Sequence, residues 1–253
     1  MSFPAKINWI MENPIHEIKD LFSPNFKSKP DSANFGASDQ AGSDSKRDLP
    51  KDAFTRYQEA LTSENWGVAA QLLEEMKNEH LSEDEWLIEF TKIMINLNNL
   101  EKAQQLLKSA LAKKPKYALA YFLMGRLKYH ERNYFDASEY IGKAIRLDQS
   151  KASFWYWHGV VLRKNGLLKE AGRALTNAHK IAAMDHQIIY LLGVVYFEMH
   201  QFQDAIETFQ LIENQPSFCK DVCYYMANSY KELKLPQAEE YYARYKELQN
   251  IRQ

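Results

Sequence analysis

The sequence predicts an all-α protein in which pairs of helices repeat along most of the chain. The chain has 253 residues with only nine Gly and eight Pro, so few residues interrupt helices. Within each predicted unit, two apolar stripes have the spacing of a helix face. From about residue 50 onward, small and apolar residues recur every 34 residues, as one series shows: Ala69, Ala103, Ala137, Ala171 and Ala205.

The first expected element is a short amphipathic helix within residues 1–26. Asn13 followed by Pro14 is typical of a helix cap and a first-turn proline. A helix this short is marginal in water, so it either docks on a partner or on its own protein, or it is a frayed tail. Mixed charges around it disfavour a membrane surface. The residues of this N-terminal docking helix are Ile15, Ile18, Leu21 and Phe22.

Residues 27–49 have a different composition, in which Ser, Asp, Gly, Pro and Asn dominate. Only Phe35 and Leu49 in this stretch are large and apolar. Such a segment cannot bury enough surface to offset the entropy of ordering it. The sequence therefore predicts a disordered linker between the N-terminal segment and the remainder of the chain.

Residues 50–253 divide into six units by the 34-residue period. In one unit, Asn165-Gly166 separates a first apolar stripe, which includes Trp155, from a second, which includes Leu175. Each hairpin buries only part of its apolar face, and stacked neighbours bury the remainder, so we expect an open solenoid. The expected units are 50–83, 84–117, 118–151, 152–185, 186–219 and 220–253.

This pattern resembles the tetratricopeptide repeat (TPR) family, a 34-residue helix–turn–helix with small and aromatic residues at set positions. The resemblance covers about residues 50–253, roughly four-fifths of the chain. It implies a right-handed superhelical solenoid whose first helices line a concave groove for peptides or helices of partner proteins. Among the clearest matches are Leu192, Gly193, Tyr196, Ala205 and Pro216.

Helical geometry indicates which side chains would line such a groove, because unit positions 2, 5, 9, 12 and 13 form a stripe separate from the core stripe. Five of the six residues at position five are aromatic. Contiguous apolar surface marks interaction sites, and aromatic residues and Arg anchor interfaces. Alternatively, these rings pack between neighbouring first helices. The candidate groove residues are Phe54, Ile88, Phe122, Arg126, Tyr129, His130, Tyr156, Trp157, Arg163, Lys164, Tyr190, Phe197 and Tyr224.

The same stripe carries a cluster of basic residues, namely Lys92, Arg126, Arg163 and Lys164, with His130 beside them. Basic residues beside aromatic rings indicate a ligand with apolar anchors and some acidic character. Chaperone-associated members of the resembled family hold a terminal carboxylate with a Lys at position five of the first unit. Here position five of the first three units is Phe54, Ile88 and Phe122, so we do not expect that carboxylate clamp.

Several functional classes are disfavoured by composition and motifs. The 32 basic and 33 acidic side chains give a net charge of −1, which argues against a dedicated nucleic-acid binder. Two Cys cannot form a disulfide framework. The sequence has neither an export signal nor an apolar run long enough to span a membrane. No string typical of nucleotide, metal or hydrolase sites occurs, so we expect no catalytic residues, cofactor or metal.

The sequence therefore predicts a cytoplasmic, non-enzymatic adaptor or chaperone-like module that binds a peptide or helix of a partner protein in its groove. The alternative is a structural subunit of a larger apparatus, of the bacterial motility, pilus or secretion type, assembled through end-to-end or lateral solenoid contacts. Neither the partner nor the oligomeric state follows from the sequence.

Overall fold

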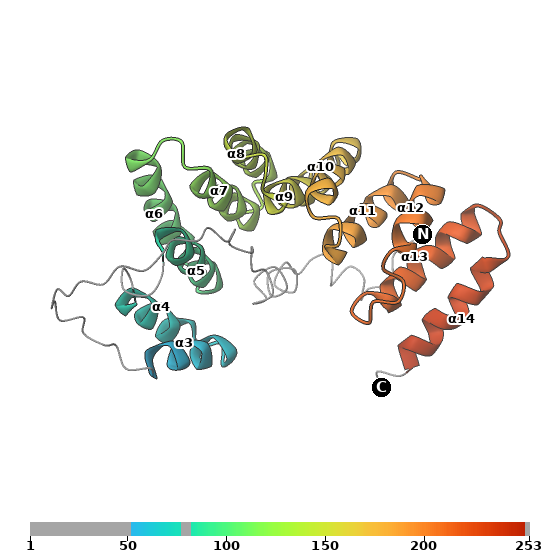
Figure 1. Cartoon of the computed structure of the whole chain (residues 1–253), viewed down its shortest axis with the longest axis horizontal. Helices are drawn as coiled ribbons and strands as arrows, with labels where there is room; N and C mark the ends of the chain where they lie inside the picture. Colours follow the sequence, from blue (N-terminus) through green and yellow to red (C-terminus); the bar gives the residue numbers. More distant parts are fainter. Residues whose placement is uncertain (1–51, 77–81, 251–253) are drawn as a thin grey trace, which may run out of the picture. The chain divides into compact units, whose positions relative to one another are not determined.

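The computed structural model describes residues 52–76 and 82–250, and side chains from Thr55 onward. Within these ranges the regular structure consists of twelve helices and no strand (Figure 1). The predicted N-terminal helix with Ile15, Ile18, Leu21 and Phe22, and the predicted linker, lie outside the described residues.

The helices come in six pairs. In chain order the pairs are α3 (Asp52–Thr62) with α4 (Trp66–Glu75), α5 (Glu83–Asn96) with α6 (Leu100–Lys113), α7 (Ala118–His130) with α8 (Tyr134–Leu147), α9 (Ala152–Lys164) with α10 (Leu168–Ile181), α11 (His186–Glu198) with α12 (Phe202–Gln210), and α13 (Cys219–Glu232) with α14 (Gln237–Asn250).

Each pair packs internally, and the second helix of a pair packs on the first helix of the next pair. From α5 to α13, each first helix also contacts the next first helix directly. Contacts therefore run only between neighbours, as they do in solenoids. The predicted all-α solenoid of helix–turn–helix repeats is confirmed.

Small residues recur at one position because the two helices of a pair cross there at very close range. A methyl group added to Gly125 would lie 2.5 Å from Ile141 Cγ1 and 3.0 Å from the carbonyl oxygen of Ala137. A methyl group added to Gly159 would lie 2.6 Å from Leu175 Cγ. Separations this short are excluded by van der Waals repulsion, so larger side chains at these crossings would force the helices apart.

The turn inside every pair has the same backbone design. In each turn, one residue has a left-handed conformation, with φ between 53° and 76°. In the third turn, for example, the amide of Arg132 donates to the carbonyl of Tyr129 at 2.9 Å, and Asn133 donates to Lys128 at 3.0 Å. These two hydrogen bonds define a Schellman motif. The left-handed residues are Glu64, Asn98, Arg132, Gly166, His200 and Lys234.

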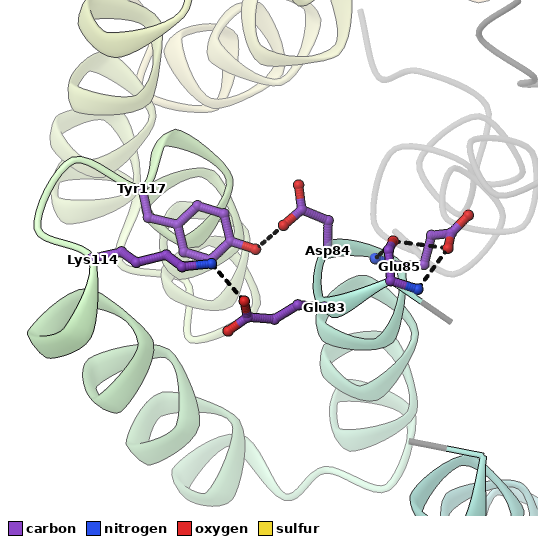
Figure 2. Close-up of polar contacts among 6 residues, drawn as sticks. Glu83, Asp84, Glu85, Lys114 and Tyr117 are labelled. Atoms are coloured by element: carbon purple, nitrogen blue, oxygen red, sulfur yellow. Dashed lines mark hydrogen bonds and ion pairs between the residues drawn. The ribbon is translucent and has the colours of Figure 1, made fainter. Parts of the chain in front are cut away.

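The start of α5 is fixed by a capping box and by contacts to the segment that joins α6 to α7 (Figure 2). The Ser82 hydroxyl accepts a hydrogen bond from the Glu85 amide, and the Glu85 carboxylate accepts one from the Ser82 amide. Lys114 pairs with Glu83 at 2.5 Å, and the Tyr117 hydroxyl donates to Asp84. Three acidic residues in the first turn also suit the positive end of the helix dipole.

The last helix, α14, differs from the helices before it. It contains no buried residue, whereas α12 buries Ala205, Ile206 and Phe209. Its Tyr241 hydroxyl donates to Glu213 at 2.9 Å, and its Tyr242 hydroxyl donates to Asn228 at 3.2 Å. Helix α14 thus packs on the array through tyrosines whose hydroxyls reach polar partners, which suits the end of a solenoid.

Candidate partner-binding face

The predicted groove residues lie on the first helices of the six pairs. Together with Lys92 of α5 and Glu198 of α11, they form the surface that we call the first-helix face. The side chain of Phe54 is outside those described. Five members are buried, namely Phe122, Arg126, Tyr129, Tyr156 and Trp157. The others are half-buried, namely Ile88, Lys92, His130, Arg163, Lys164, Tyr190, Phe197, Glu198 and Tyr224.

Helices α7 and α9 build the centre of this face from a buried cation and four rings. The guanidinium carbon of Arg126 lies 4.6 Å from the ring centroid of Trp157 and 5.9 Å from that of Phe122. The Phe122 ring stacks on Phe154 of α9 at 4.6 Å, and Tyr129 meets Trp157 edge-on at 5.5 Å. We call these five residues the central cluster. Cation–π attraction helps to stabilise the charge of Arg126 away from water.

Burial also sets the ionisation of the central polar groups. Arg126 is 4% exposed, and burial lowers its pKa to about 10, which leaves it protonated at neutral pH. Burial, together with the charge of Arg126, lowers the pKa of His130 to about 4. His130 is therefore neutral at neutral pH, and its Nε2 atom has no hydrogen-bond partner in the described part of the chain.

An ion pair with two hydrogen bonds joins the first helices α9 and α11. Arg163 of α9 donates from Nε and from Nη2 to the two carboxylate oxygens of Glu198 of α11, each at 2.7 Å. The side chains are 11% and 28% exposed. Forked pairs of this kind are stronger and more directional than single ion pairs, because two parallel hydrogen bonds fix the guanidinium plane.

A second aromatic group, the α11–α13 cluster, continues the face toward the C-terminus. Tyr190 stacks on Phe218 at 5.1 Å, and Phe197 meets Tyr225 at 5.3 Å. Phe209 of α12 stacks on the same Tyr225 ring at 5.5 Å. Burial raises the pKa of the Tyr225 hydroxyl, so this group stays neutral throughout the physiological range.

At the N-terminal end, the face is polar and internally paired. The Tyr57 hydroxyl of α3 donates to Glu89 of α5 at 2.9 Å, and Glu89 also lies 3.7 Å from the Lys92 ammonium. Burial and the nearby carboxylate raise the pKa of Tyr57. The Tyr57–Glu89 hydrogen bond thus joins the first helices α3 and α5 at this end.

The predicted set thus separates into groups that the structure brings together and groups that it does not. Phe122, Arg126, Tyr129 and Trp157 meet in the central cluster, and Tyr190 and Phe197 share a neighbour in Tyr225. Tyr224 meets Tyr225 edge-on at 5.6 Å and also lies against Tyr245 of α14 at 5.5 Å. Part of the aromatic set therefore packs between neighbouring helices, as the alternative interpretation expected, and a binding role for the set stays a prediction.

Three residues that complete these groups are absent from the predicted set: Phe154, Glu198 and Tyr225. Glu198 lies at unit position 13, on the predicted groove stripe, and follows Arg163 by 35 residues. Phe154 and Tyr225 lie outside the groove stripe in sequence register, and only the packing of neighbouring helices brings them to it.

The charge along the first helices is strongly uneven. Helices α7 and α9 each carry two basic residues other than His, and neither contains an Asp or a Glu. Helix α5, by contrast, contains five charged residues, of which four are acidic. Helices α7 and α9 are therefore basic in sequence, but two of their four cations pair with carboxylates from outside these helices. Lys128 pairs with Glu131 at 2.7 Å, and Arg163 pairs with Glu198 at 2.7 Å.

In the described ranges, no three His, Cys, Asp or Glu side chains are arranged as metal ligands. Cys219 and Cys223 are free thiols on α13, and burial raises the pKa of Cys223 to about 11. Across residues 52–76 and 82–250, none of the helices is both long and apolar enough to cross a membrane.

Comparisons with known proteins agree with this architecture. A family model for the anaphase-promoting complex, cyclosome, subunit 3, matches residues 117–212. No curated protein matches the chain in sequence.

Solved structures match more widely. The crystal structure of YrrB, described as a TPR protein with an unusual peptide-binding site, is similar over 72% of this chain and 94% of that chain, with 22% identity and a TM-score of 0.61. The match to the crystal structure of MamA covers 64% of this chain and 95% of the MamA chain, with 21% identity and a TM-score of 0.59. The match to PilF from Pseudomonas aeruginosa covers 65% of this chain and 76% of the PilF chain, with 23% identity and a TM-score of 0.56. Likeness at these identities shows the fold, and together with the 34-residue period and the six helix pairs it shows that the described chain has the fold of tetratricopeptide-repeat proteins.

Proposed function

We propose that this chain is a non-enzymatic interaction scaffold that holds a peptide or helix of a partner protein against its first-helix face. The observation that supports this most is the row of half-buried aromatic and basic side chains along the first helices, among them Lys164, Tyr190 and Phe197. Aromatic residues and Arg are the side chains that anchor protein interfaces. The description of YrrB as a TPR protein with an unusual peptide-binding site supports the same use of the fold here. We propose that it acts in the cytoplasm and binds no nucleic acid.

We further propose that the N-terminal segment with Ile15, Ile18, Leu21 and Phe22 provides a second contact for the partner. This segment lies outside the described residues, and the proposal rests on its apolar stripe alone. Replacing Ile18 and Phe22 by Asp in the full chain removes the stripe. Weaker partner capture by this variant supports a shared contact, and unchanged capture contradicts it.

Site-specific photo-crosslinking tests the location of the partner. A benzophenone amino acid in place of Lys164 lies on the first-helix face, whereas the same group in place of Lys180 lies on the exposed side of α10. We expect a discrete adduct with a partner protein from position 164 and none of the same mass from position 180. Equal adducts from both positions, or an adduct from position 180 alone, would place the partner elsewhere.

A further inference from the structure

We infer that Cys219 and Cys223 form an oxidisable dithiol, in which a hydroperoxide oxidises the Cys219 sulfur and Cys223 then closes an intrachain disulfide. The site is independent of the proposed function, because neither thiol belongs to the first-helix face. Three features support it: the spacing of the two thiols, their unequal burial, and a guanidinium beside one of them.

The two thiols span the first turn of α13. Cys219 is the first residue of this helix and Cys223 follows four positions later, so both side chains lie on the same face. Helical geometry places their α carbons about 6 Å apart, within the range that a disulfide spans. A disulfide also needs its β carbons closer than a regular helix holds them, so the first turn must shift. This turn follows the non-helical residues 211–218, and helix ends fray readily.

The two thiols differ in their access to solvent. Cys223 is 0% exposed, whereas Cys219 is half-buried. Burial, followed by the nearby Cys219 sulfur, raises the pKa of Cys223 to about 11, so Cys223 keeps its proton at neutral pH. Because the thiolate is the form of cysteine that reacts, and because solvent reaches Cys219 first, oxidation starts at Cys219.

A cation from the last helix faces the accessible thiol. Arg244 of α14 donates a hydrogen bond from Nη2 to the Cys219 sulfur at 3.6 Å, and another to Asn214 Oδ1 at 3.4 Å. Asn214 lies in the segment before α13, so the guanidinium contacts both sides of the start of that helix. A neighbouring guanidinium and a helix N-terminus each stabilise negative charge on a sulfur. Cys219 has both, and this is the setting in which cysteines react with oxidants.

The reaction has two steps, with hydrogen peroxide as the oxidant. The Cys219 thiolate attacks one peroxide oxygen, an S–O bond forms, and the O–O bond breaks to release hydroxide, which takes up a proton from water. The sulfur is oxidised to sulfenic acid by the two electrons that reduce the peroxide. The Cys223 sulfur then attacks the Cys219 sulfur, the S–O bond breaks, and hydroxide leaves as water with the Cys223 proton. Because Cys223 holds that proton firmly, the second step is the slower one.

Closing the disulfide changes how α14 is held. The Cys219 sulfur becomes neutral and turns toward the buried Cys223, so Arg244 loses its acceptor on α13. Helix α14 buries no side chain completely, and it therefore depends on contacts of this kind. The hydrogen bonds of Tyr241 and Tyr242 remain, so α14 loosens without detaching.

The first test treats the reduced full chain with hydrogen peroxide at neutral pH and maps its thiols by mass spectrometry. We expect an intrachain Cys219–Cys223 disulfide that dithiothreitol reverses, and this map requires no substitution. In Cys223→Ala, sulfenic acid should persist at Cys219 and be trapped by dimedone, whereas Cys219→Ala should leave Cys223 unreacted. A disulfide between two chains, no disulfide at all, or oxidation of Cys223 in Cys219→Ala at the wild-type rate would overturn the inference.

The second test asks whether Arg244 promotes the reaction. Arg244→Gln should slow the oxidation of Cys219 severalfold, and Arg244→Lys, which retains a cation, should restore part of the rate. The matched change Lys246→Gln lies on the same helix but lines the surface pocket beside Lys231, and it should leave the rate unaltered. Equal rates for Arg244→Gln and Lys246→Gln would contradict the role of the guanidinium.

Hydrogen exchange of the reduced and the oxidised wild-type chain tests the coupling to α14. We expect severalfold faster exchange of the α14 amides after oxidation, and unaltered exchange in α7. Unaltered exchange in α14 would contradict its loosening by the disulfide.

Discussion

Single residues in this protein act mainly through close approach and through burial. Gly125 permits a helix crossing at a distance that no side chain tolerates, and the surroundings of His130 hold an imidazole neutral. These effects differ in their visibility in the sequence. A periodic Gly can be predicted to lie at a crossing, whereas the neutral state of His130 depends on Arg126 and on burial, which the sequence does not reveal.

Replacing Gly125 by Ala should destabilise the protein, because the new methyl group meets backbone atoms of α8 that cannot move aside. We expect a loss of about 1–3 kcal/mol in the free energy of unfolding. Gly142→Ala on α8 is the matched control. Its nearest neighbour is the end of the Arg146 side chain at 3.6 Å, so this change should stabilise the protein by about 0.5–1 kcal/mol. Urea unfolding measures both, and equal effects would refute the crossing argument.

The lowered pKa of His130 makes stability depend on pH in a defined window. Its pKa is about 4 in the folded state, below the ordinary value of 6.5, so the unfolded chain binds more protons between these values. Stability from the neutral imidazole is thus complete above pH 6.5 and is lost as the pH falls toward 4, by roughly 2 kcal/mol at pH 5. Urea unfolding at pH 7 and pH 5 should show a smaller decrease for His130→Gln. An unchanged decrease would assign the effect to other groups.

At the scale of elements, the helix pairs could be predicted well from the sequence, whereas the turns inside the pairs could not. The alternation of stripes around Asn165-Gly166 placed a turn correctly, because Gly in a left-handed conformation is a familiar signal. The equivalent turns use Glu64, Arg132 and His200, which give no such signal. Helical period also fixes which side a residue faces, but not how far the next helix covers it. Trp157 was therefore expected at the edge of a groove, and its side chain is 1% exposed.

The shared turn design predicts opposite effects for opposite substitutions. Gly166→Ala should cost about 1–2 kcal/mol through left-handed strain alone, since a Cβ there would meet no atom within 4 Å. His200→Gly, at the same position of the next turn, should relieve that strain and raise stability by about 1 kcal/mol or less, because Gly loses more chain entropy. Thermal or urea unfolding distinguishes the two. A neutral Gly166→Ala would show that the turn conformation is not a constraint.

At the scale of the whole molecule, the last described helix, α14, buries none of its side chains completely. Near the last turn, a surface pocket is lined by Lys231, Lys234 and Lys246 together with Glu239, beside apolar atoms of Leu235, Pro236, Ala238, Tyr242 and Ala243. A scaffold that holds its partner on the first-helix face leaves this surface uncovered, whereas an end-to-end assembly subunit binds a second copy there.

We therefore expect the full chain to be a monomer at micromolar concentration. Light scattering coupled to size exclusion should give the mass of one chain, independent of concentration. Glu239→Leu with Lys246→Leu removes two of the charges and should promote association through α14. A wild-type mass that rises with concentration, and that these changes do not alter, would favour assembly through another surface.

The Arg163–Glu198 pair has a mechanical consequence. A chain of units that touch only their neighbours behaves as a spring, and its stiffness is set joint by joint. The two short hydrogen bonds between α9 and α11 hold the first helices of two neighbouring units together. Opening that joint on the first-helix side must stretch both bonds, while bending it the other way need not. Under tension this joint should therefore resist opening on the first-helix side more than bending in the opposite direction.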